Sequence, residues 1–415
     1  MLRIMKVLLL AVCLFASTIF PSLSLASNSS NDTVSVTEAK KMAVFQIVMD
    51  MKTDDQSPWH NKTVKIQDPI EVYDATETLC SYLFNLTIDG EPAGFIETSA
   101  LRDEWPILSF SYGESDITSS QLAKYVNKNK DSVSENVYKD PLSEKVVLLG
   151  PGKFGLKQNF SDGSAKIYST LETINITKDQ NKPKQKHSLK VNQDARNLRE
   201  NIDLVVGDIG SSNDGVTDDL SFETGERDME IISSVPDLNQ INSSLWTGPS
   251  GCSPTSAANV MIYWARFGYP ELTEDLSNEE LLFQLREEMG TYYNSEKGTS
   301  PTPVNNISPG MQDFARNRGL SEASARYLDE TWLDYRWAIN DGFPIVISFE
   351  DQTYYGDHSV TGMGYKTFSY NGQTTGHRYM QVHDNSPITP GTVYIAWDRN
   401  YEGIFFDQFS PDGNY

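Results

Sequence analysis

Apolar and polar residues repeat with two different periods along the first half of the chain. Between Val34 and Met51, the sequence VSVTEAKKMAVFQIVMDM carries apolar residues at helical spacing, and Thr37 and Glu38 suit the start of a helix. The sequence TLCSYLFNLTIDGEPAGFIETSA alternates on both sides of Asp89-Gly90, a strong hairpin signal. EWPILSFSY and KVVLLGPGKFGLK follow as two further predicted strands. The pattern predicts an α+β domain over residues 34–175.

The pattern is lost between residues 176 and 234. KDQNKPKQKHSLK is basic and poor in apolar residues, and GDIGSSNDGVTDDLSFETGERD is acidic and rich in Gly and Ser. Neither stretch can bury much apolar surface, so residues 176–234 are predicted to form a flexible linker whose lysines are exposed to proteases.

Apolar periodicity returns in residues 235–415, where GPSGCSPTSAANVMIYWARFG predicts a buried helix. Ser253 suits its N-cap, Pro254 its first turn and Gly268 its end. The helix is apolar almost all round, as expected for an element inside a core. Cys252 is therefore predicted to lie at the N-terminus of a fixed, buried helix.

Residues 1–26 look like a secretory signal peptide. They combine a basic start, a short apolar run and a small-residue cleavage site. No later segment is apolar enough to span a membrane, so the chain is expected to be exported without a stable membrane anchor. The formal net charge of −23 argues against nucleic acid as a partner. Beyond the signal peptide only Cys80 and Cys252 remain, too few for a disulfide scaffold, although one disulfide between them is an alternative.

Cys252 has the environment of a nucleophile. The dipole and the unpaired N–H groups of a helix N-terminus favour a thiolate and can hold an oxyanion. The alternative is a small cysteine that only packs. A thiolate mechanism also needs a histidine base and a group that orients it. His358 opens a predicted strand, and Asp384 ends the next one, which a hairpin would return beside His358. Asn385 is the alternative orienting residue, because a one-residue shift changes the face.

The other histidines have weaker cases. His383 should point to the opposite sheet face, and His377 sits in a Gly-rich turn, so both are expected at the surface or in packing. His60 and His187 fall in the predicted N-terminal domain and linker. Because no CxxC or HExxH motif is present, neither a metal nor another cofactor is expected.

The order of these residues resembles papain-like cysteine peptidases of the bacteriocin-processing, double-glycine-leader type, and more closely their secreted relatives without a transporter. The resemblance rests on Val235-Pro236, Gln240, the run Gly251-Cys252-Ser253-Pro254-Thr255-Ser256, and the late His358 and Asp384. It implies a papain-like fold, with helices on one side and a twisted antiparallel sheet on the other. It also implies that Gln240 is an oxyanion donor, Cys252 the nucleophile, His358 the base and Asp384 the orienting residue. Ser253 departs from the family pattern, which usually has Gly there.

The segment SYLFNLTIDGEPAGFIETSALRDEWPILSFSYG is similar to prodomains of streptopain-type peptidases. This resemblance implies that residues 34–175 assist folding or inhibit the catalytic domain, and that maturation would cut the linker. The alternative is a permanent accessory domain that binds a wall component or a peptide.

The sequence thus predicts a secreted, extracellular cysteine peptidase that acts on peptide or protein substrates, with a bacterial origin and cell-wall association as accompanying hypotheses. Trp246, Tyr354 and Tyr355 are expected to line the substrate cleft or to pack. Two alternatives are a cell-wall peptide amidase or transpeptidase, and a binding protein that keeps the fold without turnover.

Overall fold

The computed structural model describes most of the chain after the predicted signal peptide. The described residues are 33–114, 117–130, 140–170, 173–181, 191–207, 215–218, 224–225, 227–352, 356–370, 377–399, 401 and 403–415. The predicted signal peptide, His187, Tyr354 and Tyr355 lie outside them. Among the described residues, no helix is both long and apolar enough to cross a membrane.

Helices and strands alternate in a mixed α+β fold. The helices are α1 (Val36–Thr53), α2 (Ser119–Lys130), α3 (Gln193–Val206), α4 (Cys252–Arg266), α5 (Asn278–Glu288), α6 (Ile307–Asn317) and α7 (Trp332–Asn340), with short 3-10 turns at Pro270–Leu272 and Val304–Asn306. The strands are β1 (Val64–Ile66), β2 (Ile70–Tyr73), β3 (Leu79–Ile88), β4 (Glu91–Ser99), β5 (Ile107–Tyr112), β6 (Ser143–Gly150), β7 (Lys153–Asn159), β8 (Ala165–Tyr168), β9 (Thr173–Ile176), β10 (Asp228–Ile231), β11 (Ser324–Leu328), β12 (Ile345–Glu350), β13 (His358–Phe368), β14 (His377–His383), β15 (Val393–Ala396) and β16 (Gly403–Ser410).

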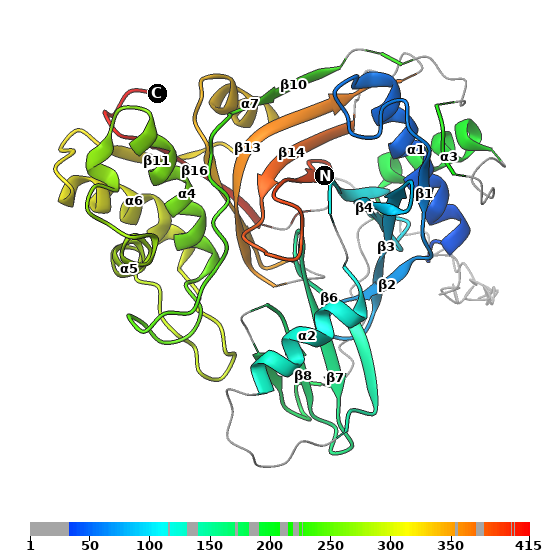
Figure 1. Ribbon diagram of the computed structural model, residues 1–415, viewed down its shortest axis with the longest axis horizontal. Helices are drawn as coiled ribbons and strands as arrows, with labels where there is room; N and C mark the ends of the chain where they lie inside the picture. The colour runs from blue at the N-terminus through cyan, green and yellow to red at the C-terminus, as the bar shows by residue number, and fades with distance from the viewer. Residues whose placement is uncertain are drawn as a thin grey trace, which may run out of the picture.

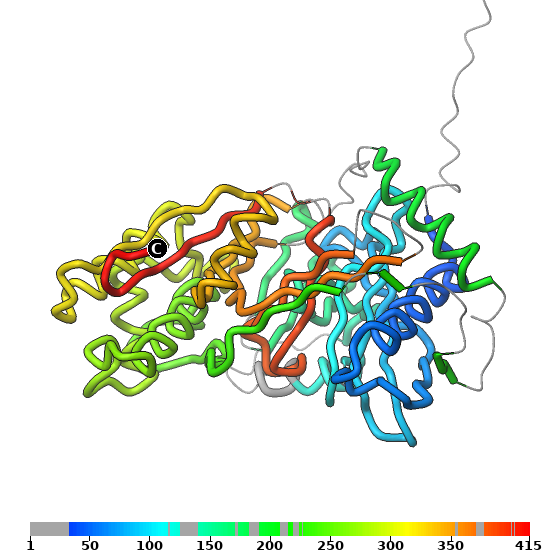
Figure 2. The backbone as a smooth tube through the Cα atoms, turned by 90° about the horizontal axis from the view of Figure 1, so that it is seen from above, coloured from blue at the N-terminus to red at the C-terminus, as the bar shows by residue number. Residues whose placement is uncertain are grey.

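One large twisted sheet runs through the described part of the chain. Its strand order is β11-β16-β12-β13-β14-β15-β5-β4-β3-β2-β6-β7-β8-β9, with β1 paired to β3 and β10 paired to β13. Helices α4, α5 and α6 lie at one end, and α1 and α3 at the other, with β13 and β14 between them (Figure 1). The view from above shows the same order along the long axis (Figure 2). The C-terminal half has the expected helices against a twisted antiparallel sheet, but this sheet continues into the N-terminal half, where β2 and β6 pair in parallel.

The predicted N-terminal elements are present, with one correction. Helix α1 begins after Ser35, whose side chain accepts from the N–H of Glu38, and the turn at Asp89-Gly90 joins β3 to β4. The run KVVLLGPGKFGLK, however, is not one strand. It forms the hairpin of β6 and β7, because Pro151-Gly152 supplies the fixed φ and the positive φ of +74° that a tight turn needs.

The prediction of an unstructured linker is wrong for two stretches. Residues Gln193–Val206 form α3, whose buried residues Ala195, Leu198 and Ile202 have helical spacing. The strand β10 pairs with β13 from Asp228↔Thr367 to Ile231↔Gly364. The basic stretch at 182–190 lies outside the described residues.

Helix α4 is buried as predicted but begins earlier. Gly251 is its N-cap, with φ of +88°, and Cys252 is already in the helix. Ser253 is therefore no cap, and its hydroxyl instead lies 2.9 Å from that of Ser359 on β13. Cys80 and Cys252 are both free thiols, so the alternative of a disulfide between them is wrong.

Candidate active site

Three chain segments meet at the start of α4. They are the loop that carries Gln240, the first turn of α4 with Cys252, and the adjoining ends of β13 and β14 with His358 and Asp384. The side chain of Cys252 is half-buried, whereas Gln240, His358 and Asp384 are almost fully buried. The structure therefore brings the four residues selected from the sequence into one region.

The loop before Cys252 is held by hydrogen bonds to its own neighbours and to α5. Ser250 N–H donates to Ile241 O at 2.8 Å, and Ile241 N–H donates to the Ser250 hydroxyl at 3.1 Å. Arg286 of α5 donates to Pro249 O at 2.9 Å and to Ser250 O at 2.7 Å. These bonds fix the backbone that leads into Cys252 and the segment that follows Gln240.

Asn385 ties the nucleophile segment to the histidine segment. Its side-chain N–H₂ group donates to the Ser256 hydroxyl at 2.8 Å and to Ser359 O at 2.9 Å, and shares a hydrogen in a longer bond to Cys252 O at 3.3 Å. Its own backbone O accepts from Gln240 N–H at 3.4 Å. Asn385 has a φ of 60°, in the left-handed region that Asn tolerates better than most residues. One buried amide thus reaches both Cys252 and the neighbour of His358.

The ring of His358 is oriented by a backbone group. Its Nε2 lies 3.0 Å from the backbone O of Asp384, and since a carbonyl only accepts, Nε2 must carry the proton. Nδ1 is then the basic nitrogen, and it has no hydrogen-bond partner among the described residues. The hairpin of β13 and β14 returns Asp384 beside His358, as expected, but the contact is made by its carbonyl and not by its carboxylate.

The Asp384 carboxylate holds its own loop. It accepts from the Thr389 hydroxyl at 2.8 and 2.7 Å and from Ser386 N–H at 3.0 Å. Burial raises the pKa of Asp384 to about 8 despite these bonds. The carboxyl group is therefore mostly protonated near pH 7, and its visible role is to shape the loop that presents the carbonyl to His358.

A turn from the N-terminal half covers the histidine. A Cβ added at Gly150 would lie 2.7 Å from His358 Cβ, and one added at Gly152 would lie 2.3 Å from the Asp384 carboxylate. Only glycines fit this closely. Burial, and secondarily the charge of Lys153, lowers the pKa of His358 to about 3, so the ring is neutral at physiological pH.

The covering turn was not predicted from the sequence as a functional feature. Its one sequence signal is the Pro151-Gly152 pair inside an otherwise apolar run, which marks a tight turn but does not tell what the turn contacts. The sequence also did not predict the hydrogen bonds of the Asn385, Arg286 and Thr389 side chains. The bonds of Asn385 and Arg286 join segments that are distant in sequence, and the bond of Thr389 to Asp384 depends on the conformation of the loop between them.

The remaining sequence candidates pack. His383 is buried, with Nε2 3.2 Å from Val235 O, and its Nδ1 contacts Gly391 O. His377 opens β14 in an apolar site, where burial lowers its pKa to about 4. Trp246 lies under the guanidinium of Arg286 at 5.3 Å from the ring centroid. Within the described residues, no group of three or more His, Cys, Asp or Glu side chains could hold a metal ion.

Comparison with known proteins places the site inside a region of recognised similarity. No curated protein matches the chain. A solved fragment of prointerpain A from Prevotella intermedia has 12% sequence identity and a TM-score of 0.40, over 84% of this chain and 99% of that chain. Residues 232–410 match the model of the Peptidase_C39 like family. The region that holds Cys252, His358 and Asp384 is therefore similar to a peptidase family.

Proposed function

We propose that the protein is a secreted cysteine peptidase, held in a blocked form by its own N-terminal half. The observation that carries the proposal is the Asn385 clamp, which holds Cys252, at the N-terminus of a buried helix, beside the strand that begins with His358. The similarity of residues 232–410 to a peptidase family supports it. Export is supported by the pattern of residues 1–26.

In the proposed reaction, His358 Nδ1 takes the proton from the Cys252 thiol. The thiolate attacks the carbonyl carbon of the scissile peptide, and N–H groups at the start of α4, with the Gln240 amide, hold the oxyanion. The C–N bond breaks as His358 returns the proton to the leaving amine, and a thioester remains. His358 then accepts a proton from water, whose oxygen attacks the thioester and releases the acid and the thiol.

The covering turn explains the blocked form. A Cys–His pair needs an imidazole that can become protonated, and the turn keeps His358 out of water, where the charged ring is disfavoured. We propose that the turn at 150–152 is the inhibitory contact between the two halves of the chain. Substrates are peptides or proteins that reach Cys252 once this turn moves.

Labelling of Cys252 by a thiol-reactive peptidyl epoxide tests the peptidase proposal. The wild type and Gly152→Ala, whose added Cβ would push the turn away, are treated and the adduct is mapped by mass spectrometry. Fast labelling of Cys252 in Gly152→Ala, lost in the double variants with Cys252→Ala or with His358→Ala, is the expected result. Buried Cys80 is the internal control, since burial raises the pKa of its thiol.

Two other outcomes contradict the proposal. Labelling of Cys252 no faster than that of free cysteine in either protein would mean that the thiol is not activated. Labelling that is unchanged by His358→Ala would mean that His358 is not its base. If the Gly152→Ala protein is incubated with peptides and joins them to each other instead of hydrolysing them, the protein is a transpeptidase.

A further inference from the structure

The two halves of the chain share one sheet. Strand β5 of the N-terminal half pairs with β15 of the C-terminal half through Phe110↔Tyr394 and Ser109↔Ile395. The Ser111 hydroxyl also donates to Thr392 O across the same boundary. The rings of Phe110 and Tyr394 stack with their centroids 4.6 Å apart. This junction is built like the interior of a sheet and not like a contact between two finished domains.

A buried ion cluster crosses the same boundary. Lys366, on β13, is fully buried, and its Nζ lies 2.6 Å from Asp50 and 2.7 Å from Asp54, at the end of α1. Lys366 also donates to the Tyr112 hydroxyl at 2.7 Å, which in turn donates to Asp50 at 2.7 Å. Among the described residues, the anionic partners of this ammonium group, Asp50 and Asp54, both belong to the N-terminal half. Without that half, the C-terminal sheet would present a lysine whose partners are gone.

Apolar packing continues across the boundary. Phe45 of α1 lies against Tyr370 and His377, with ring centroids at 4.9 and 5.2 Å. Gln46 of α1 accepts from the Tyr379 hydroxyl at 2.9 Å. Residues of α1, α3 and β3–β5 share one hydrophobic cluster with Phe368, Tyr370, Tyr379, Tyr394 and Ala396. One face of β13–β15 is therefore completed by the N-terminal half.

We propose that the N-terminal half is a permanent part of the C-terminal core, so that a cut between α3 and β10 gives a stable two-chain protein and not a released prodomain. Such a cut leaves the turn at 150–152 over His358, because the turn belongs to the retained half. The consequence for the active site rests on the proposed function, whereas the association of the halves does not. Activation then requires movement of the turn, not removal of residues 34–206.

A site for a sequence-specific protease, inserted after the exposed Asp218, tests the association. The full chain carries Cys252→Ala, so that it cannot cut itself. After cleavage, we expect both fragments to leave a size-exclusion column together in equal amounts at submicromolar concentration. Fragments that separate in native buffer, with the C-terminal fragment still folded by circular dichroism, would overturn the proposal.

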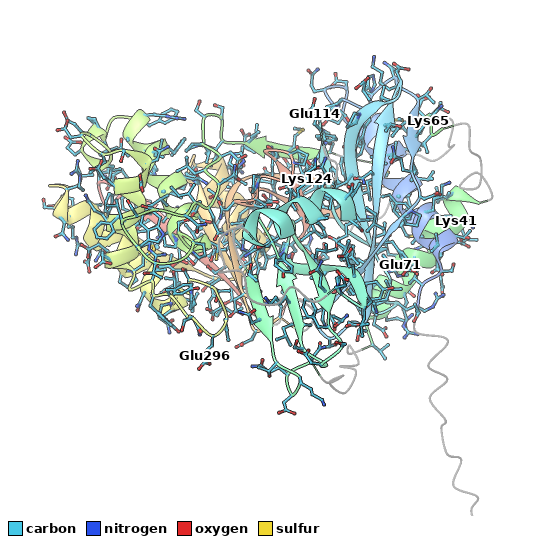
Figure 3. The ribbon with its side chains drawn as sticks, turned by 60° about the horizontal axis from the view of Figure 1, so that its bottom comes forward. Lys41, Lys65, Glu71, Glu114, Lys124 and Glu296 are labelled. Carbon is cyan, nitrogen blue, oxygen red and sulfur yellow. The ribbon has the colours of Figure 1, made fainter. Side chains whose placement is uncertain are left out.

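A pair of lysine variants shows what holds the fragments together. Lys366→Met removes the buried cation that bridges the two halves and should weaken the fragments' association by at least about a hundredfold. Lys41→Met is the matched control, because Lys41 pairs with Asp203 at 2.6 Å inside the N-terminal half. Figure 3 shows Lys41 at one end of the molecule, well away from the labelled Glu296 of the C-terminal half.

If Lys366→Met does not fold, urea titration of the cut Cys252→Ala chain gives the answer. A single transition, in which separation and loss of secondary structure coincide, supports the shared core. Release of the N-terminal fragment before the C-terminal fragment unfolds contradicts it.

Epoxide labelling of the cut chain with Cys252 intact separates this proposal from the proposed function. We expect the same slow labelling before and after the cut, and faster labelling with Gly152→Ala in both. Faster labelling after the cut, together with separated fragments, would overturn the inference and leave the peptidase proposal standing. If the fragments stay associated but Cys252 is unreactive in every form, the shared core stands and the peptidase proposal is contradicted.

Discussion

At the scale of single residues, the site depends more on backbone groups than the sequence suggested. Asp384 was selected for its carboxylate, yet its carbonyl contacts His358. Ser253 occupies a position that the resembled family usually gives to Gly, and the structure supplies a reason. Its hydroxyl joins Ser359, which also lies 2.9 Å from the Ser348 hydroxyl, so the three serines link α4 to β12 and β13.

Asn385→Ala should impair the chemical step more than substrate binding. Loss of the clamp frees the start of α4 to shift against β13, and a displacement of about 1 Å lowers rates by roughly a hundredfold. In the Gly152→Ala background we expect kcat to fall by that order while KM changes little. Asn85→Ala is the control, because Asn85 is also buried but its side chain bonds Ile117 O, which belongs to none of the three segments that form the site. Equal losses in both variants would reduce the role of Asn385 to general stability.

At the scale of elements, the β6–β7 hairpin is the part whose movement would uncover the site. Its tip fits against His358 and Asp384 because Gly150 and Gly152 have no side chains. The tip of a hairpin moves more easily than the loop of Asp384, whose carboxylate is held by Thr389 and Ser386. A methyl group added at Gly152 should therefore displace the turn and not Asp384.

A comparison of the Gly152→Ala and Gly90→Ala variants separates displacement of the turn from backbone strain. Both glycines have positive φ, of +74° and +90°, so both variants bear similar backbone strain, but a Cβ at Gly90 meets nothing within 4 Å. We expect peptidase activity or Cys252 labelling to rise by about tenfold or more in Gly152→Ala and to stay at the wild-type level in Gly90→Ala, because only the first displaces the turn. Equal rates in the two variants would show that the turn does not block the site.

The elements that the sequence predicted well are those with local signals. The periodicity of α1, the Asp89-Gly90 turn and the apolar helix after Cys252 all depend on neighbours in the chain. The β6–β7 hairpin was read as one strand because Pro151-Gly152 interrupts an apolar run by only two residues. The pairing of β5 with β15 and the contact from Ser253 to Ser359 join segments more than 100 residues apart, and no local pattern encodes them.

At the scale of the whole molecule, buried titratable groups set how stability depends on pH. Burial raises the pKa of Asp384 to about 8 and that of Asp407 to about 7, whereas both would be near 3.8 in the unfolded chain. Their protonated forms are favoured in the fold, so their contribution is lost as pH rises toward 8. His358 and His377, with pKa values lowered to about 3 and 4 from 6.5, act in the opposite direction, but mainly below pH 6.5.

The free energy of unfolding should therefore fall between pH 6.5 and 8, where the histidines offset the two aspartates only in part. At about 1.4 kcal/mol per proton and pH unit, the two aspartates lose between about 2 and 3 kcal/mol over this interval and the histidines regain about 1 kcal/mol. The net loss is therefore about 2 kcal/mol, measured by urea denaturation at fixed pH values. Asp384→Asn should almost abolish this loss, because the contribution of Asp407 and that of the two histidines nearly cancel over the interval. A wild-type stability that rises over the same interval would contradict the assignment of these buried acids.

The junction of β5 with β15 also bears on how the chain stays soluble while it is made. Without β5, the sequence Val393-Tyr394-Ile395-Ala396 would be an apolar strand at an open edge, with N–H and C=O groups available to pair with another molecule. Synthesis proceeds from the N-terminus, so β5 leaves the ribosome long before β15. Strand β5 is therefore already present when β15 is made, and it can pair with β15 before another molecule does. In this way the first half of the chain lowers the tendency of the second half to aggregate.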